Sequence, residues 1–212
     1  MLYRFLWYAL RAFIDLPFRV RVLGRERVPS AGGVILAPNH ESYVDPVVVA
    51  LALPRIVHFM ARDDLWRHRA FGRLIEALHA FPVRRGTADR AAIAEASRLL
   101  DAGEQVLIFP QGTRHHAPGL DGLEEGAGGA ALIALRTGCP VVPVGIDGTG
   151  GIRPPGTRLP RFPRVTVAFG EPMVPADIPE GPRRERVSAM TARIMEGIAA
   201  AVAEASAEGR SR

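Results

Sequence analysis

The chain has 212 residues, of which 48% are hydrophobic, and this is enough for one domain with a substantial core. Its formal net charge is +5 and all 27 basic residues are arginine, so the absence of lysine excludes a phosphate-binding P-loop and any Schiff-base chemistry. Arginine binds phosphate through two hydrogen bonds, which favours an anionic substrate or an anionic bilayer as the partner. Genomic base composition is an alternative explanation for the exclusive use of arginine.

The first 18 residues predict a helix that lies in a membrane interface. They are rich in aromatic and aliphatic side chains, but Arg4, Arg11 and Asp15 interrupt the apolar run, which is therefore too short to span a bilayer. Arg4 and Arg11 fall on one helix face, from which they can reach lipid headgroups. Further arginines follow at once and favour the cytoplasmic side of an anionic membrane. They are Arg19, Arg21, Arg25 and Arg27. A terminal helix packed on the core is the alternative.

Beyond this segment, short apolar runs alternate with amphipathic segments. Five runs predict buried strands, over residues 33–38, 56–60, 105–109, 141–146 and 164–169. Four segments predict helices, over residues 45–53, 87–102, 126–137 and 182–205. This succession predicts an α/β fold in which a layered mixed sheet is flanked by helices and functional residues lie in loops at strand ends. We expect residues 1–28 to form the interfacial helix and a basic linker, and residues 29–212 to form the folded domain.

A candidate base and its partner follow the first predicted strand. Residues 39–46 read Asn-His-Glu-Ser-Tyr-Val-Asp-Pro. The imidazole of His40 can take up a proton near neutral pH, and the carboxylate of Asp45 can orient it. This pair suits the transfer of an acyl group from a thioester to an alcohol, because the alcohol needs a base whereas the departing thiolate needs little help.

Each of these residues has a structural alternative. His40 could cap a strand end or pack in the core, and Asp45, which precedes Pro46, could cap the next helix. One carboxylate can serve both roles if one oxygen caps the helix and the other reaches His40. Ser42 is not expected to be a hydrolase nucleophile, because no serine of the chain lies in a Gly-x-Ser-x-Gly motif.

A second polar block follows the predicted strand 105–109. Residues 109–114 read Phe-Pro-Gln-Gly-Thr-Arg. Arg114 stands just past a strand and a glycine turn, where a planar guanidinium can hold a phosphate monoester with two hydrogen bonds.

Together the two blocks resemble the 1-acylglycerol-3-phosphate O-acyltransferase family, which is marked by His-x4-Asp and by Phe-Pro-Glu-Gly-Thr-Arg. The resemblance covers residues 33 to about 171 and implies a glycerol-3-phosphate acyltransferase-like fold, with residues 29–212 as the acyltransferase domain. It implies that His40 deprotonates the acceptor hydroxyl and that Asp45 fixes the tautomer of the histidine.

The resemblance also implies a set of substrate-binding residues. In the family, the second block contacts the glycerol phosphate of the acceptor, which here implies Gln111, Gly112, Thr113 and Arg114. Residues 81–86, Phe-Pro-Val-Arg-Arg-Gly, resemble the middle block of the family, whose phosphate-binding arginine matches Arg85. A solvated basic turn is the alternative for that segment.

Two positions depart from the family pattern. Gln111 stands where glutamate is usual, and it keeps the size and one acceptor oxygen of glutamate but loses the charge. Glu124 and Glu125 stand where relatives often carry basic residues. These departures suggest another lysolipid or a glycolipid as an alternative acceptor.

The resemblance implies a peripheral or monotopic membrane enzyme of phospholipid biosynthesis on the cytoplasmic face of the cell membrane. Its expected reaction moves a fatty acyl chain from acyl-CoA or acyl carrier protein to 1-acyl-sn-glycerol 3-phosphate, which gives phosphatidic acid. No metal, no tightly held cofactor and no nucleic-acid partner is expected. A rival of another class is a non-catalytic basic protein that binds membrane surfaces or nucleic acid, but it gives no reason for the spacing of His40 and Asp45.

Overall fold

The structure, a computed structural model, describes residues 17–84, 89–110, 128–152 and 161–210. Within these residues it contains a seven-stranded sheet with the order β1-β7-β6-β2-β5-β3-β4. The strands are β1 (Arg21–Leu23), β2 (Val34–Pro38), β3 (Val57–Arg62), β4 (Ala80–Val83), β5 (Gln105–Leu107), β6 (Val141–Asp147) and β7 (Thr166–Phe169). All neighbouring strands are parallel except β6 and β7, which are antiparallel, so the predicted mixed sheet is confirmed.

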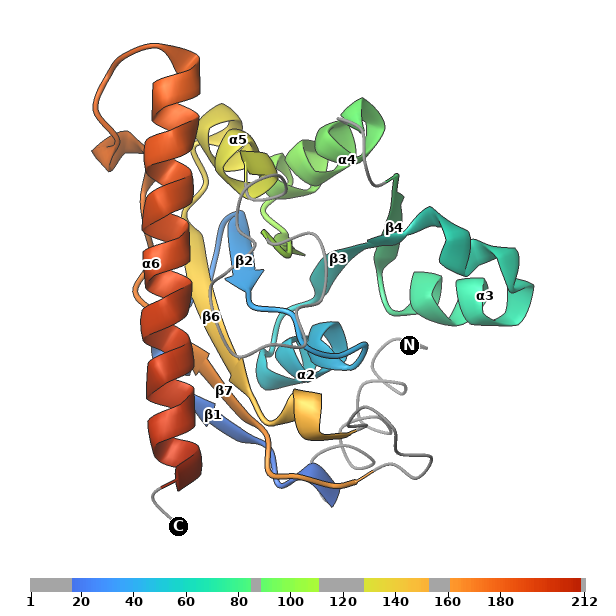
Figure 1. The fold of residues 1–212 in the computed structure, drawn as a ribbon. Helices are drawn as coiled ribbons and strands as arrows, with labels where there is room; N and C mark the ends of the chain where they lie inside the picture. Colours follow the sequence, from blue (N-terminus) through green and yellow to red (C-terminus); the bar gives the residue numbers. More distant parts are fainter. Residues whose placement is uncertain (1–16, 85–88, 111–127, 153–160, 211–212) are drawn as a thin grey trace.

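Helices cover both faces of the sheet (Figure 1). They are α2 (Asp45–Ala52), α3 (Arg69–Ala77), α4 (Arg90–Asp101), α5 (Gly128–Thr137) and α6 (Arg183–Arg210). The central strand β2 shows how one sequence serves two cores, because successive side chains of a strand point to opposite faces. Val34 and Leu36 pack with α2, whereas Ile35 and Ala37 pack with α4, α5 and α6. All four side chains are fully buried, as expected for a strand that is covered on both faces.

The long helix α6 contacts β6 at a point where only glycine fits. A Cβ atom on Gly145 would lie 2.1 Å from the backbone carbonyl carbon of Ala201. Both partners at this contact are backbone, so neither can move aside as a flexible side chain would. The glycine of the segment Val-Pro-Val-Gly-Ile therefore sets how closely α6 approaches the sheet.

We expect Gly145→Ala to lower the free energy of unfolding by about 1–3 kcal/mol, because α6 must move away from β6 to admit the methyl group. Gly129→Ala is the matched control: Gly129 lies in α5 with no atom within 4 Å of an added Cβ. That change should raise the stability by roughly 0.5 kcal/mol, since alanine is the better helix former. Urea denaturation measures both, and equal midpoints for Gly145→Ala and the parent would contradict the close contact.

Two strands and one α-helix of the described residues were not predicted from the sequence. They are the strands β1 and β4 and the helix α3. β1 and β4 lie at the two edges of the sheet, and neither stands in a continuous apolar run, because Arg21 begins β1 and Pro82 lies within β4. β4 also occupies the start of the segment 81–86, so Phe81 is buried in a strand rather than placed in a solvated turn.

The predicted basic linker differs from the structure over residues 21–28. β1 pairs with β7 inside the sheet, and Arg27 Nη1 lies 3.0 Å from Glu204 Oε2 on α6. Arg21 also forms an ion pair with α6, through Glu208. These arginines therefore join the N-terminal segment to the domain, because carboxylates of α6 face them.

The predicted interfacial helix lies, except for Pro17 and Phe18, outside the described residues. Phe18 is buried, and its ring lies 5.4 Å from that of Phe162. Within the ranges that the structure describes, no helix is both long and apolar enough to cross a membrane.

Candidate active site

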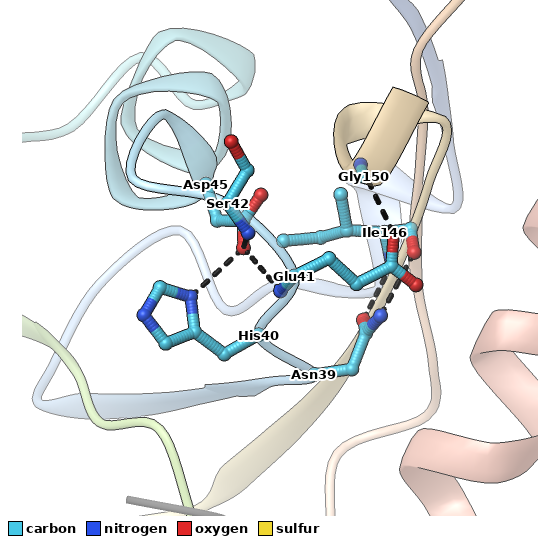
Figure 2. Close-up of polar contacts among 7 residues, drawn as sticks. All are labelled: Asn39, His40, Glu41, Ser42, Asp45, Ile146 and Gly150. Atoms are coloured by element: carbon cyan, nitrogen blue, oxygen red, sulfur yellow. Dashed lines mark hydrogen bonds and ion pairs between the residues drawn. The ribbon is translucent and has the colours of Figure 1, made fainter. Parts of the chain in front are cut away.

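The loop that carries His40 begins at the carboxyl end of β2, between β6 and β5. Asn39 holds this point (Figure 2). Its side-chain Nδ2 donates to the carbonyl oxygen of Ile146 at 2.9 Å, and its Oδ1 accepts from the backbone N–H of Ile146 at 2.7 Å. The amide thus pairs both backbone groups of Ile146, which a longer β2 would otherwise pair in the parallel ladder. This pairing sets the direction in which the chain leaves β2 and delivers His40.

His40 and Asp45 are in direct contact. Nδ1 of His40 lies 2.8 Å from Oδ2 of Asp45. His40 is 7% exposed and Asp45 is fully buried. An ionised carboxylate can only accept, so Nδ1 carries the ring proton and Nε2 of the neutral ring is left with its lone pair. Figure 2 shows the other ring nitrogen directed away from Asp45.

The same oxygen of Asp45 organises the whole turn. Oδ2 also accepts hydrogen bonds from the backbone N–H groups of Glu41, at 2.7 Å, and Ser42, at 2.8 Å. The N-cap residue of α2 is Val44, and Asp45 is the first residue of the helix with its carboxylate turned back toward the preceding loop. The alternative that Asp45 caps the helix is therefore wrong. Its Oδ1 is buried and has no hydrogen-bond partner among the described residues.

An aromatic ring fixes the imidazole from the neighbouring strand. The rings of His40 and Phe109 are stacked, with centroids 3.9 Å apart and planes 27° from each other. Phe109 follows β5, whose ladder with β2 continues one residue further, as Ile108 N–H donates to Leu36 O at 2.9 Å. Because parallel neighbours end at the same edge of a sheet, β2 and β5 bring the two polar blocks of the sequence together there.

The predicted substrate-binding residues lie outside the described residues. They are Arg85, Gln111, Gly112, Thr113 and Arg114. The structure does place residues that precede them in the chain. Phe109 contacts His40. β4 ends at Val83 at the same end of the parallel strands as His40, and β3 and β5 lie between β4 and β2. The roles of these five residues stay predictions.

Glu41 is a site neighbour that the sequence did not single out. Its Oε2 accepts a hydrogen bond from Gly150 N at 3.3 Å, which ties the histidine loop to the short helix η3 (Thr149–Ile152). Burial raises the pKa of Glu41, and the nearby carboxylates of Asp45 and Asp147 act in the same direction. Sequence adjacency to His40 was the one available signal for Glu41, whereas Asn39 and Phe109 stand inside the two polar blocks themselves.

Comparison with known proteins shows the family of the chain. The family model described as Acyltransferase matches residues 19–147. The chain is 32% identical over 200 residues to the 1-acyl-sn-glycerol-3-phosphate acyltransferase of Bacillus subtilis (strain 168), which covers 93% of this chain and 95% of that relative. It is 34% identical over 146 residues to the enzyme of the same name from Streptococcus pneumoniae, which covers 68% of this chain but 51% of that longer relative.

The fold is also similar to a solved structure. It matches the crystal structure of the 1-acyl-sn-glycerophosphate (LPA) acyltransferase, PlsC, from Thermotoga maritima with a TM-score of 0.70. The match covers 93% of this chain and 80% of that chain at 23% sequence identity. At this identity the similarity shows the shared α/β architecture.

Proposed function

The chain belongs to the acyltransferase family, and from this premise we propose that it acylates 1-acyl-sn-glycerol 3-phosphate to phosphatidic acid in phospholipid biosynthesis. The acyl donor of the proposed reaction is a fatty acyl thioester, either acyl-CoA or acyl carrier protein. The observation that carries the proposal is the 2.8 Å contact between His40 Nδ1 and Asp45 Oδ2, at the end of a buried strand. It provides a base that is already oriented for an incoming hydroxyl.

In the proposed mechanism, Nε2 of His40 takes the proton of the acceptor hydroxyl while the hydroxyl oxygen attacks the thioester carbonyl carbon. The carbon–sulfur bond then breaks, and the thiolate leaves and takes a proton from the imidazolium. Asp45 stabilises the imidazolium by its charge, and Phe109 limits rotation of the ring. No enzyme nucleophile is needed, because the alcohol attacks the donor directly.

The test is an acceptor screen with free thiol release as the readout. The purified chain would receive acyl-CoA or acyl carrier protein together with lysophosphatidate, other lysophospholipids, a lysoglycolipid or a monoacylglycerol of the same chain length. We expect the highest kcat/KM with lysophosphatidate. A preference for an acceptor without a phosphomonoester would instead support the alternative that Gln111, Glu124 and Glu125 suggest. No acceptor-dependent thiol release with any of them would contradict the proposal.

The proposed phosphate clamp makes a separate prediction. We expect Arg114→Lys to raise the KM for lysophosphatidate about tenfold, because lysine keeps the charge but loses one of two charge-assisted hydrogen bonds. The slow hydrolysis of the thioester by water should change little, since it does not use the acceptor. The control acceptor is a monoacylglycerol of the same chain length. An equal loss with that control would mean that Arg114 holds the structure or contacts the donor.

We further propose that the protein acts at the cytoplasmic surface of an anionic membrane. Both the acceptor and the product of the proposed reaction are lipids, and the net charge of the chain is +5. Of the four arginines that follow the predicted interfacial helix, Arg21 and Arg27 form ion pairs with α6, whereas Arg19 and Arg25 are exposed and can bind lipid headgroups. Binding through such exposed charges should weaken as the salt concentration rises.

A further inference from the structure

Helix α3 carries an apolar surface that the fold covers only in part. Gly72 and Ile75 are buried against the domain, but Phe71 is 44% exposed and Leu74 is 43% exposed. Residues of a helix advance by about 100° each, so Leu74, Phe71 and Ile75 form one continuous apolar stripe. The core takes one edge of this stripe, and the other edge faces outward.

Exposed arginines lie on the far side of the outward face of α3. By the same rotation Arg73 lies about 100° from Leu74, with two alanines between them, and Arg69 lies next to Arg73, while Arg67 precedes the helix. Arg67, Arg69 and Arg73 are all exposed, and none of them makes an ion pair with any residue that the structure describes. The acidic residue of the same helix is engaged elsewhere, since Glu76 Oε1 accepts a hydrogen bond from Trp66 Nε1 at 2.6 Å. Arg67, Arg69 and Arg73 stand against this single carboxylate, so the outward face of α3 keeps a net positive charge that an external anion can meet.

The two carboxylates just before the helix are also engaged. They lie in η2 (Asp63–Arg67). Asp64 Oδ1 accepts from Arg62 Nε at 3.0 Å, and Asp63 Oδ2 lies 3.9 Å from Arg84 Nε. Among the described residues, this local pairing leaves the outer side of α3 with apolar side chains and with arginines that have no carboxylate partner.

The position of α3 relates this surface to the site. The helix lies beyond the edge strand β4, at the outer margin of the sheet (Figure 1). η2 and α3 follow the carboxyl end of β3, and β5 alone separates β3 from β2, the strand that ends at His40. Trp66 anchors the helix, because its side chain would lie 3.1 Å from a Cβ on Gly72. The surface thus lies at the same end of the sheet as the candidate base.

We propose that Phe71 and Leu74, with Arg67, Arg69 and Arg73, form a surface that docks on an anionic lipid bilayer; we call it the α3 surface. The two apolar side chains enter the boundary between headgroups and acyl chains, while the guanidinium groups bind lipid phosphates. The role of this docking rests on the proposed function, because docking would bring the candidate active site to an acceptor that resides in the bilayer. The docking itself does not depend on catalysis.

The charge of the α3 surface favours a bilayer over a second copy of the chain. A stable protein interface buries about 800 Å² on each partner, far more than two half-exposed side chains provide. A symmetric dimer would also bring the arginines of two copies close to each other, which is unfavourable. An anionic bilayer matches both the apolar stripe and the charge.

The test uses the full-length chain and sedimentation with vesicles of phosphatidylcholine, with or without phosphatidylglycerol. Phe71→Gln/Leu74→Gln should weaken binding to both kinds of vesicle about tenfold. Arg69→Gln/Arg73→Gln should weaken binding to the anionic vesicles alone, by about tenfold. The matched controls are Val174→Gln, at a residue 43% exposed, and Arg184→Gln, at an exposed residue of α6, and both should bind like the parent.

The outcomes separate this inference from the proposed function. Loss of vesicle binding in the α3 variants supports the surface whether or not the protein releases thiol. Parental vesicle binding by both α3 variants would overturn the inference while leaving the enzymatic activity intact. If binding is parental and Phe71→Gln/Leu74→Gln converts a dimer to a monomer in analytical ultracentrifugation, a second copy covers the surface instead. If binding is parental and the melting temperature of Phe71→Gln/Leu74→Gln falls, another part of the chain covers the α3 surface.

Discussion

Replacing His40 by alanine is expected to lower acceptor-dependent thiol release by about 10²–10⁴-fold, the usual contribution of a positioned general base. The reason is geometric: Asp45 holds Nδ1, so Nε2 is the nitrogen that can receive the hydroxyl proton. The loss should appear in kcat, because the ring acts on the hydroxyl in the transition state and is not expected to hold the lipid chain. A continuous thiol assay at saturating acceptor measures it.

The fold should survive this change. His40 lies at a strand end, and Oδ2 of Asp45 keeps the backbone N–H groups of Glu41 and Ser42 as partners when the imidazole is removed. Vesicle binding and the melting temperature are the controls. His58→Gln is the matched variant, because His58 lies near the amino end of β3, away from the candidate site, and should release thiol at the parental rate. Parental thiol release by His40→Ala would show that another group removes the proton.

Asp45→Asn is expected to cause a loss of similar size, up to about 10⁴-fold, together with about 1–3 kcal/mol of stability. Three donors converge on Oδ2, so the amide has no good orientation. With its oxygen at that position, the amide NH2 takes the place of the buried, unpartnered Oδ1, and the imidazolium loses its counter-charge. With NH2 there, the amide opposes two backbone donors and forces the histidine proton onto Nε2.

A double variant separates positioning from a general loss of structure. If Asp45 acts through His40, then His40→Ala/Asp45→Asn should release thiol no more slowly than His40→Ala alone. Urea denaturation gives the stability part of the effect independently. Multiplied losses in the double variant would mean that Asp45 supports activity by a route that does not include the histidine.

Sequence patterns determined the central elements of this protein. The apolar runs 33–38, 105–109 and 141–146, which gave β2, β5 and β6, are long enough to be recognised locally, and Asn39, Pro110 and Asp147 interrupt them directly. For the same reason the pairing of His40 with Asp45 was predictable: both residues lie in one short turn, so their contact depends on five residues of chain. The family, the fold class and the mixed sheet followed from these local signals.

Only the tertiary structure decided what depends on distant segments. The stack of Phe109 on His40 requires β5 to lie beside β2, and the bond from Asn39 to Ile146 requires β6 on the other side. The pairing of Arg27 with Glu204 joins residues 177 positions apart. Nothing in the local sequence therefore distinguishes Arg27 from Arg69 and Arg73, which make no ion pair with any residue that the structure describes. Periodicity reports which side of an element is apolar, whereas strand order and long-range packing decide which apolar side is covered and which one, as at Phe71 and Leu74, is left exposed.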